Sequence, residues 1–293
     1  MNRAETLAPA KVNLGLAVTG RRDDGFHNLH SIMATLDVGD IVGVEALDAA
    51  GIRLELSGNT GGVPSGPDNL AWRAAAVFTD WLRSRHSHQE APGLLITLHK
   101  TLPVAAGLGG GSSDAAAVLR CLAALFDEAA PINALALGLG SDVPFLLHGG
   151  VRLVSGRGEV LEPLSAPPLY LVLANPGVAV SAREAYAGLA GRCGSPLEVE
   201  AIQAALQAGD EPPWRNDLQP WVATGAPAVR EALDALRSAG LRGVLMSGSG
   251  STCFGLAGSD AQARREAFLL AGRRPTWWVT AARTAALPKV ATG

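Results

Sequence analysis

The sequence predicts a two-domain α+β protein, and three observations lead to this fold class. The chain has 293 residues, a length that allows two domains of about 100–200 residues each. Hydrophobic residues make up 48% of it and charged residues 17%, so each domain can bury a core without disulfides, and a disordered chain is excluded. In the second half, the predicted strands and helices follow the order β-α-β-β-α-β, which is the ferredoxin-like arrangement.

The first half combines β-type segments with two helical patterns. In the second of these helices, apolar side chains recur at i, i+3 and i+4 spacing and form one apolar face. Such a face has to pack against another element of the same domain. The predicted strands are 12–19, 41–46, 52–57 and 94–99, and the predicted helices are 69–85 and 113–126.

The second half follows a stretch rich in glycine and proline. Residues 149–158 and 166–168 have the composition of a domain junction, which predicts an N-terminal domain of residues 1–160 and a C-terminal domain of residues 161–293. The predicted elements of the second domain are strands 169–174, 244–247, 252–257 and 277–281 and helices 226–239 and 260–271.

Charge and cysteine content limit the partners and the compartment. A net charge of −3 disfavours nucleic acid as a partner, since nucleic-acid binders normally present a basic face. Cys121, Cys193 and Cys253 lie far apart, as is common in a reducing compartment. No signal-peptide pattern or apolar run of membrane-spanning length is found, so we expect a cytoplasmic protein without a membrane partner. The sequence leaves monomer and homodimer equally open.

A glycine-rich segment, 103–114, is the most informative part of the chain. It holds four glycines at 107, 109, 110 and 111 and lies between a predicted strand and the strongest predicted helix. Glycines let the backbone turn tightly and approach a ligand closely, and Ser112 or Ser113 could cap the helix that follows. A helix N-terminus attracts anions, phosphate above all. One glycine would suffice for a turn without a ligand, so the cluster favours a phosphate site.

Two common phosphate-binding motifs do not match this segment. The dinucleotide fingerprint requires a third glycine where Ser112 stands, and the Walker A loop requires a lysine that is missing here. Asp114 would repel a nearby phosphate, so we expect it to point away or to lie near a bound cation. The segment is therefore a phosphate site of another class.

Together with three other segments, the glycine-rich segment resembles the GHMP kinase superfamily. The resemblance runs through nearly the whole chain and implies an N-terminal ATP-binding domain like domain 2 of ribosomal protein S5 and a ferredoxin-like C-terminal domain. Shorter matches occur at 68–70, 175–177 and 216–218. The four main segments are 8–14 with its continuation 20–27, 103–114, 139–145 and 246–251.

The resemblance implies an ATP-dependent kinase that phosphorylates an alcohol of isoprenoid precursor biosynthesis, with Mg²⁺ as a second cofactor. It assigns the catalytic roles to Lys11 and Asp142. An aspartate in this position could accept the proton of the hydroxyl group, and a lysine beside it could stabilise charge on the transferring phosphoryl group. Two simpler interpretations exist: Asp142 could cap a short helix beginning at Val143, and Lys11 could be a solvated lysine on an edge strand.

Through the start of the chain, with its Asp-Gly-Phe-His motif, the resemblance implies an acceptor that carries a cytidine diphosphate group. The residues implied around this small-molecule substrate are Asn13, Phe26, His27 and Tyr186, with Phe26 or Tyr186 stacking on the cytosine. Position 26 is often tyrosine in the family, and phenylalanine keeps the stacking while losing the hydroxyl. The turn at 248–250 could close the site from the second domain or simply join two strands.

A larger set of residues is implied for the nucleotide. Lys100 could equally be an ordinary lysine at a strand end, Asn69 an N-cap, and Ser113 a cap without contact to phosphate or Mg²⁺. The metal ligands stay unknown, because the helix glutamate that other superfamily members use cannot be placed. The implied nucleotide-binding residues are Asn69, Leu70, Lys100, Pro103, Val104, Ala105, Ala106, Gly107, Leu108, Gly109, Gly110, Gly111, Ser112 and Ser113.

Two other functions compete with this prediction. One is a GHMP kinase for a different small alcohol, which the presence of Phe26 and His27 disfavours. The other is a nucleotide-binding regulator that lost catalysis, which the presence of Lys11 and Asp142 disfavours.

Overall fold

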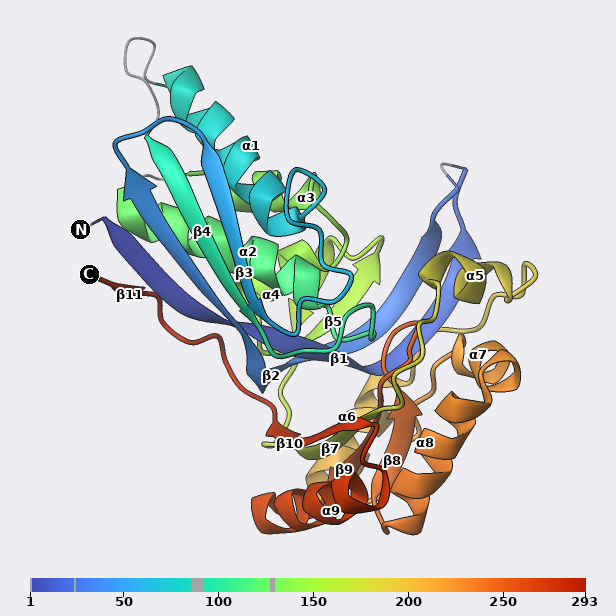
Figure 1. The fold of residues 1–293 in the computed structure, drawn as a ribbon. Coiled ribbons are helices and arrows are strands. Elements are labelled where there is room, and N and C mark those ends of the chain that lie inside the picture. The colour runs from blue at the N-terminus through green and yellow to red at the C-terminus, as the bar shows by residue number, and fades with distance from the viewer. Residues whose placement is uncertain (1, 24, 86–91, 127–129) are drawn as a thin grey trace.

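The computed structural model describes residues 2–23, 25–85, 92–126 and 130–293, and these form two domains of mixed helix and strand (Figure 1). The first sheet has seven strands, in the order β11-β1-β2-β4-β3, with β5 pairing on β2 and β6 on β5. All its pairs are antiparallel except β3 with β4. Its strands are β1 Arg3–Arg21, β2 His27–Leu47, β3 Ile52–Gly58, β4 Gly93–Lys100, β5 Val151–Gly156, β6 Val160–Pro163 and β11 Ala291–Thr292.

Helices cover one face of this sheet, and a core cluster of buried side chains lies between the two layers. The apolar face predicted for the second helix packs here, since α2 contacts both β1 and β2. The helices are α1 Leu70–Arg85, α2 Gly110–Phe126, α3 Ile132–Leu137 and α4 Val143–His148.

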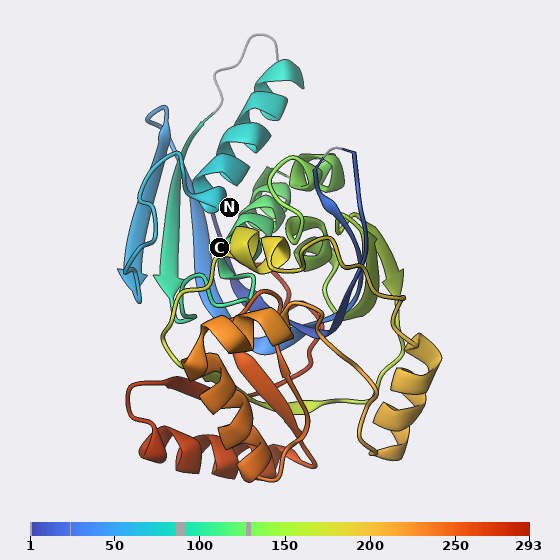
Figure 2. The same cartoon turned by 90° about the vertical axis from the view of Figure 1, so that its right-hand side faces the viewer.

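The second domain has the ferredoxin-like order that the sequence predicts. Its antiparallel sheet runs β10-β7-β9-β8, and α8 and α9 pack against it (Figure 2). The strands are β7 Tyr170–Asn175, β8 Arg242–Met246, β9 Cys253–Ala257 and β10 Trp278–Arg283. The helices are α5 Ala182–Ala187, α6 Val199–Ala208, α7 Gln219–Gly225, α8 Pro227–Ser238 and α9 Asp260–Arg273.

A shared core joins the two domains. Buried side chains of β1, such as Val12 and Leu14, cluster with Leu171 of β7 and Phe254 of β9. The second sheet is therefore covered by its own helices on one face and by the first domain on the other. After β10 the chain returns to the first domain, where β11 pairs with β1 and both termini lie close together (Figure 1).

Three predictions about the elements need correction. Strands β1 and β2 have 19 and 21 residues and extend far beyond 12–19 and 41–46. Because β1 is covered on both sides, it shows few of the alternating polar positions that mark a half-buried strand. Residues 149–158 are not a junction: most of them form β5 and the turn to β6, within the first sheet.

The third correction concerns the start of α2. The helix begins at Gly110, so Ser112 and Ser113 lie inside its first turns and do not cap it. Ser113 Oγ instead donates to the backbone oxygen of Pro9, 2.7 Å away. The division into residues 1–160 and 161–293 stays a prediction, although β6 extends to Pro163 and β11 returns to the first sheet.

Candidate active site

The glycine-rich segment leaves the end of β4 and enters α2 through a left-handed turn. Ala105, Gly107 and Gly109 have φ angles of 52°, 77° and 71°. A Cβ atom at Gly107 would lie 2.3 Å from the backbone oxygen of Ser247, so a larger residue cannot fit without displacing the second domain. Both the backbone conformation and this close approach require glycine at position 107.

Three consecutive backbone oxygens of this segment, 106–108, each accept a hydrogen bond from another part of the chain. Thr252 N–H donates to the first at 3.0 Å, Ser247 Oγ to the second at 2.9 Å, and Lys11 N–H to the third at 2.9 Å. Ser247 Oγ also accepts from the backbone N–H of Asn13 at 3.2 Å. Strand β1 and the second domain thus hold the segment from both sides.

A cavity of about 380 Å³ opens along this segment. The first N–H groups of an α-helix have no partner within the helix, so the N-terminus of α2 offers donors to an anion in this cavity. The sequence did not single out the wall formed by Gly62, Val63 and Pro64, although glycine and proline in the preceding loop were a signal. Every residue expected around the nucleotide lines the cavity except Ser113, which is buried beside Pro9.

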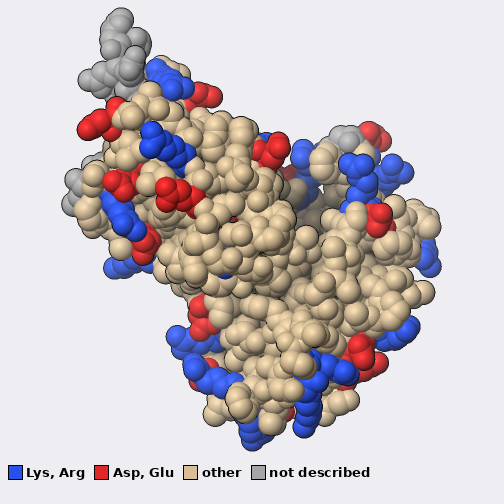
Figure 3. All heavy atoms as spheres, viewed as in Figure 1, with Lys and Arg blue, Asp and Glu red and all other residues tan. Residues whose placement is uncertain are grey.

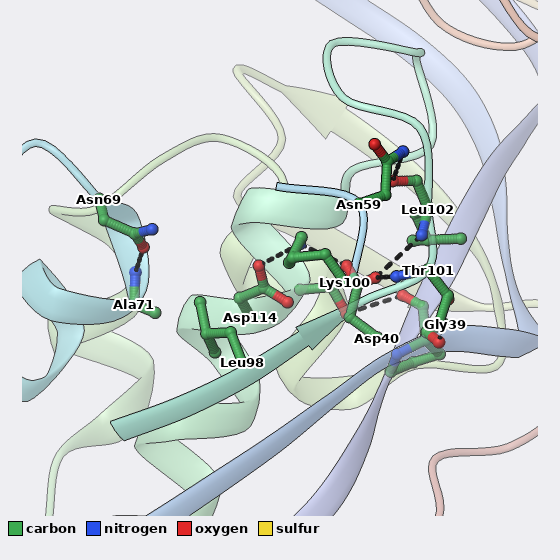
Figure 4. Close-up of polar contacts among 12 residues, drawn as sticks. Gly39, Asp40, Asn59, Asn69, Ala71, Leu98, Lys100, Thr101, Leu102 and Asp114 are labelled. Atoms are coloured by element: carbon green, nitrogen blue, oxygen red, sulfur yellow. Dashed lines mark hydrogen bonds and ion pairs between the residues drawn. The ribbon is translucent and has the colours of Figure 1, made fainter. Parts of the chain in front are cut away.

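Asn69 both caps α1 and shapes this cavity. Its Oδ1 accepts from the backbone N–H of Ala71 at 2.9 Å, as expected of a cap (Figure 4). Its Nδ2 donates to the backbone oxygen of Pro64 at 2.8 Å and holds the opposite wall in place. The two interpretations from sequence are therefore compatible.

Lys100 is the last residue of β4, but it is not an ordinary lysine at a strand end. Its side chain is buried, and its ammonium group donates to Asp40 of β2 and Asp114 of α2 (Figure 4). Burial opposes the charge of Lys100, but Asp114 and Asp40 outweigh it and raise its pKa. The partner of Asp114 is therefore a cationic side chain of the chain itself, and not the bound cation that the sequence suggested as one of two possibilities.

Lys11 and Asp142 face each other at the edge of a second cavity. Lys11 Nζ lies 3.4 Å from Asp142 Oδ2, and Asn13 Oδ1 accepts from Lys11 Nζ at 2.7 Å. Asp142 stands at the N-cap position of α4 but makes no capping hydrogen bond through its side chain. Lys11 is buried in β1 rather than exposed at an edge, while 36% of the Asp142 side chain is exposed. The carboxylate can therefore be reached by a substrate.

The second cavity has a volume of about 1040 Å³ and contains every residue expected around the acceptor. Rings of His27 and Tyr186 stack with centroids 5.1 Å apart and an angle of 20°. Burial, and then Arg21, lowers the pKa of His27, so its ring is mostly neutral and can both donate and accept hydrogen bonds. Phe26 is exposed, and the guanidinium of Arg157 lies 4.0 Å from its ring centroid.

Three arginines of this second cavity were not identified from the sequence. Arg21, Arg157 and Arg183 line it together with the turn that carries Gly248 and Ser249. That turn joins β8 to β9 and borders the cavity as well, so both interpretations of it apply. Cationic side chains suit an acceptor that carries phosphate groups.

The two cavities meet at the glycine-rich segment. Gly107, Gly109 and Ser112 line both of them. A Cβ atom at Gly109 would lie 2.8 Å from Lys11 Cγ, which places the lysine directly against this boundary. A phosphate chain bound in the first cavity would therefore end beside Lys11 and Asp142.

Within the described residues, no group of three or more His, Cys, Asp or Glu side chains could hold a metal ion. In the same residues, no helix has the length and apolar character needed to cross a bilayer. On the face shown in Figure 3, Lys and Arg side chains are interspersed with Asp and Glu.

Comparisons with known proteins agree with this geometry. The family model for the GHMP kinases N terminal domain matches residues 69–150, and the model for the GHMP kinases C terminal region matches residues 197–271. A 4-diphosphocytidyl-2-C-methyl-D-erythritol kinase from Deinococcus radiodurans is 48% identical, over 94% of this chain and 91% of the relative. The enzyme of the same name from Thermus thermophilus is 43% identical, over 93% and 94%.

Solved structures show the same relationship. A crystal structure of 4-(cytidine 5′-diphospho)-2C-methyl-D-erythritol kinase superposes with a TM-score of 0.82 at 40% identity, covering 96% of this chain and 99% of the other. A homoserine kinase from Cytophaga hutchinsonii shares the fold, with a TM-score of 0.70 at 18% identity over 99% and 97% of the two chains. The chain therefore belongs to the GHMP kinases, which transfer phosphoryl groups from ATP to small molecules, and within them to the 4-diphosphocytidyl-2-C-methyl-D-erythritol kinase family.

Proposed function

We propose that the chain transfers the γ-phosphoryl group of ATP to the 2-hydroxyl of 4-(cytidine 5′-diphospho)-2-C-methyl-D-erythritol, a reaction of non-mevalonate isoprenoid biosynthesis. One observation carries the proposal: the first and second cavities share Gly107, Gly109 and Ser112 as lining residues, beside Lys11 and Asp142. Phosphoryl transfer needs this juxtaposition, because the donor phosphate and the acceptor hydroxyl must be held in line.

Each reacting group has a residue suited to it. Asp142 would accept the proton of the 2-hydroxyl as its oxygen forms a bond to the γ-phosphorus, while the bond from that phosphorus to ADP breaks. Lys11, held by Asn13, would stabilise the negative charge on the transferring group. The N-terminus of α2 would bind the remaining phosphates through backbone N–H groups.

The acceptor would lie in the larger cavity with its cytosine near the aromatic rings. The exposed face of Phe26 and the ring of Tyr186 provide stacking surfaces, and neutral His27 provides a hydrogen-bonding edge. Arg21, Arg157 and Arg183 would face its diphosphate.

We further propose that Mg²⁺ arrives as a complex with ATP. The described residues offer no cluster of ligands for a resident ion, and Mg²⁺ usually keeps waters and binds substrate phosphates. We propose a monomer or homodimer located in the cytoplasm, without nucleic acid or membrane partners.

The test is ADP release, measured side by side with three acceptors: the cytidyl substrate, mevalonate and homoserine. We expect turnover with the first at a kcat/KM at least about a hundredfold above the others, because a site that hydrogen-bonds a base strongly rejects compounds without one. No turnover with the cytidyl substrate would refute the proposal. A preference for another alcohol would leave a GHMP kinase of different specificity.

A further inference from the structure

Asp40, Lys100 and Asp114 form a charged cluster beneath the glycine-rich segment, which we call the buried triad. Its side chains are 0%, 5% and 2% exposed, and they come from β2, β4 and α2. Lys100 Nζ donates to Asp40 Oδ2 and to Asp114 Oδ2, so one ammonium group links the three elements (Figure 4). Removing three charges from water is costly, so the cluster calls for a functional reason.

The buried triad also holds the backbone that leads into the glycine-rich segment. Asp40 Oδ1 accepts hydrogen bonds from the backbone N–H groups of Thr101 at 2.6 Å and Leu102 at 3.0 Å (Figure 4). Thr101 Oγ1 donates to the backbone oxygen of Gly39, 2.7 Å away. The exit of β4 is therefore fixed by the same carboxylate that pairs with Lys100.

The triad lies directly behind the N-terminus of α2. A Cβ atom built on Gly110, the first residue of the helix, would be 3.6 Å from Asp40 Oδ2 and 3.7 Å from Lys100 Nζ. A charge at this distance acts on an anion bound at the helix end, and burial reduces the screening by water and salt. The net charge of the triad therefore affects the binding of phosphate.

That net charge depends on one proton. With both carboxylates ionised the triad carries −1 and opposes a phosphate, while protonation of one carboxyl makes it neutral. Asp114 Oδ1 is, within the described residues, the buried side-chain atom left without a hydrogen-bond partner. Burial, opposed by Lys100 and supported by Asp40, raises the pKa of Asp114 to about 7.

Other charged groups nearby are accounted for. Asp68, which precedes α1, is exposed and lines the same cavity as Lys100 and Asp114. On β1, Lys11 lies beside Gly109 and pairs with Asp142. The groups that interact directly with Asp114 are therefore Lys100 of β4 and Asp40 of β2.

We propose that Asp40, Lys100 and Asp114 are positioning residues for ATP, which fix the glycine-rich segment and set, through the charge on Asp114, the affinity of the α2 N-terminus for the triphosphate. The inference rests on the proposed nucleotide site but requires no particular acceptor. Nucleotide binding alone can therefore test it, while turnover with the cytidyl substrate tests the proposed function separately.

The decisive variant is Asp114→Asn, which keeps the shape of the side chain and removes its charge. Calorimetric titration with Mg²⁺ and the non-hydrolysable analogue AMP-PNP gives Kd for the wild type and the variant at about pH 6 and about pH 8. The ratio of the two Kd values cancels the protonation of the analogue itself. We expect a ratio near unity at the lower pH and, for one added charge, about three- to tenfold weaker binding by the wild type at the higher pH.

Two further variants complete the experiment. Lys100→Met, which leaves two carboxylates behind the helix, should weaken binding at least about tenfold, and more at the higher pH. Thr79 is a buried residue of α1 whose hydroxyl donates to the backbone oxygen of Ala75 in the same helix, so Thr79→Val controls for the loss of a buried hydrogen bond and should leave Kd unchanged. A wild-type to Asp114→Asn ratio that is the same at both pH values would overturn the proposal. If Asp114→Asn fails to fold, Asp40→Asn takes its place under the same criterion.

Discussion

Two lysine–aspartate groups flank the glycine-rich segment, and they differ mainly in depth. Lys11 Nζ and Asp142 Oδ2 lie 3.4 Å apart at the edge of the second cavity, where a substrate can reach the carboxylate. In the buried triad, Lys100 is enclosed by Asp40 and Asp114, and none of the three is more than 5% exposed. On the roles we propose, the same pair of side-chain types would serve proton transfer where a substrate has access and positioning where it has none.

The largest expected effect is on kcat, and it should come from the Lys11–Asp142 pair. Asp142→Asn removes the proposed proton acceptor, so we expect kcat to fall by about 10²–10⁴-fold while Kd for AMP-PNP changes little. Stopped-time assays of ADP release measure the former and calorimetry the latter. Asp80→Asn, on the exposed surface of α1, is the matched control. An unchanged kcat would remove Asp142 from the mechanism.

Substitutions in the buried triad should instead have the largest effect on the free energy of unfolding. Lys100→Met leaves Asp40 and Asp114 buried without a cation, which should lower the free energy of unfolding by about 3–5 kcal/mol. Urea titration measures this loss, and Lys289→Met, at an exposed position, supplies the comparison. A loss no larger than that of the control would show that the triad does not stabilise the fold.

A smaller effect on stability is expected from a substitution where the second domain contacts the glycine-rich segment. Gly107→Ala places a Cβ atom 2.3 Å from the backbone oxygen of Ser247, at a φ of 77°. We expect a loss of about 1–3 kcal/mol in stability and a higher KM for ATP. Gly225→Ala has open space around it and should be tolerated. If both variants have the same stability and the same KM for ATP, the close approach at Gly107 does not require glycine there.

The last prediction concerns the dependence of stability on pH, which the buried triad should influence through Asp114. The pKa of Asp114 rises from 3.8 to about 7 on folding, so the folded chain retains a proton that the unfolded chain releases. This contribution to stability is complete below about pH 4 and is lost as the pH rises through about 7. Between about pH 5 and pH 8 the wild type should therefore lose roughly 3 kcal/mol more than Asp114→Asn. Parallel urea-derived stability curves for the two proteins would contradict the assignment.

Much of this arrangement could be predicted from the sequence, because it depends on local signals. The glycines at 107–111, the β-α-β-β-α-β order and the apolar face of α2 can each be recognised from residues that are close together in the sequence. The fold class follows from them, whereas the family and the kinase activity follow from the resemblance carried by four segments of the chain. All three are confirmed by the comparisons.

What could not be predicted depends on distant segments meeting. Asp40, Lys100 and Asp114 are brought together by the sheet and α2, and nothing near Asp40 in the sequence marks it as a partner of Lys100. Helices such as α3 and α5 have six residues, too few to show a periodic pattern. The start of α2 at Gly110 was missed because glycine normally disfavours helices, whereas the loop and the buried triad hold it there.

The most direct test of the account is the structure of the product made by the wild-type enzyme from ATP and the cytidyl substrate. Mass spectrometry counts the phosphoryl groups added, and ³¹P NMR identifies the carbon that carries the new one. The account predicts one added phosphoryl group, on the 2-hydroxyl, with one ADP formed for each. Phosphorylation of another hydroxyl, or ADP formed without a phosphorylated acceptor, would contradict it.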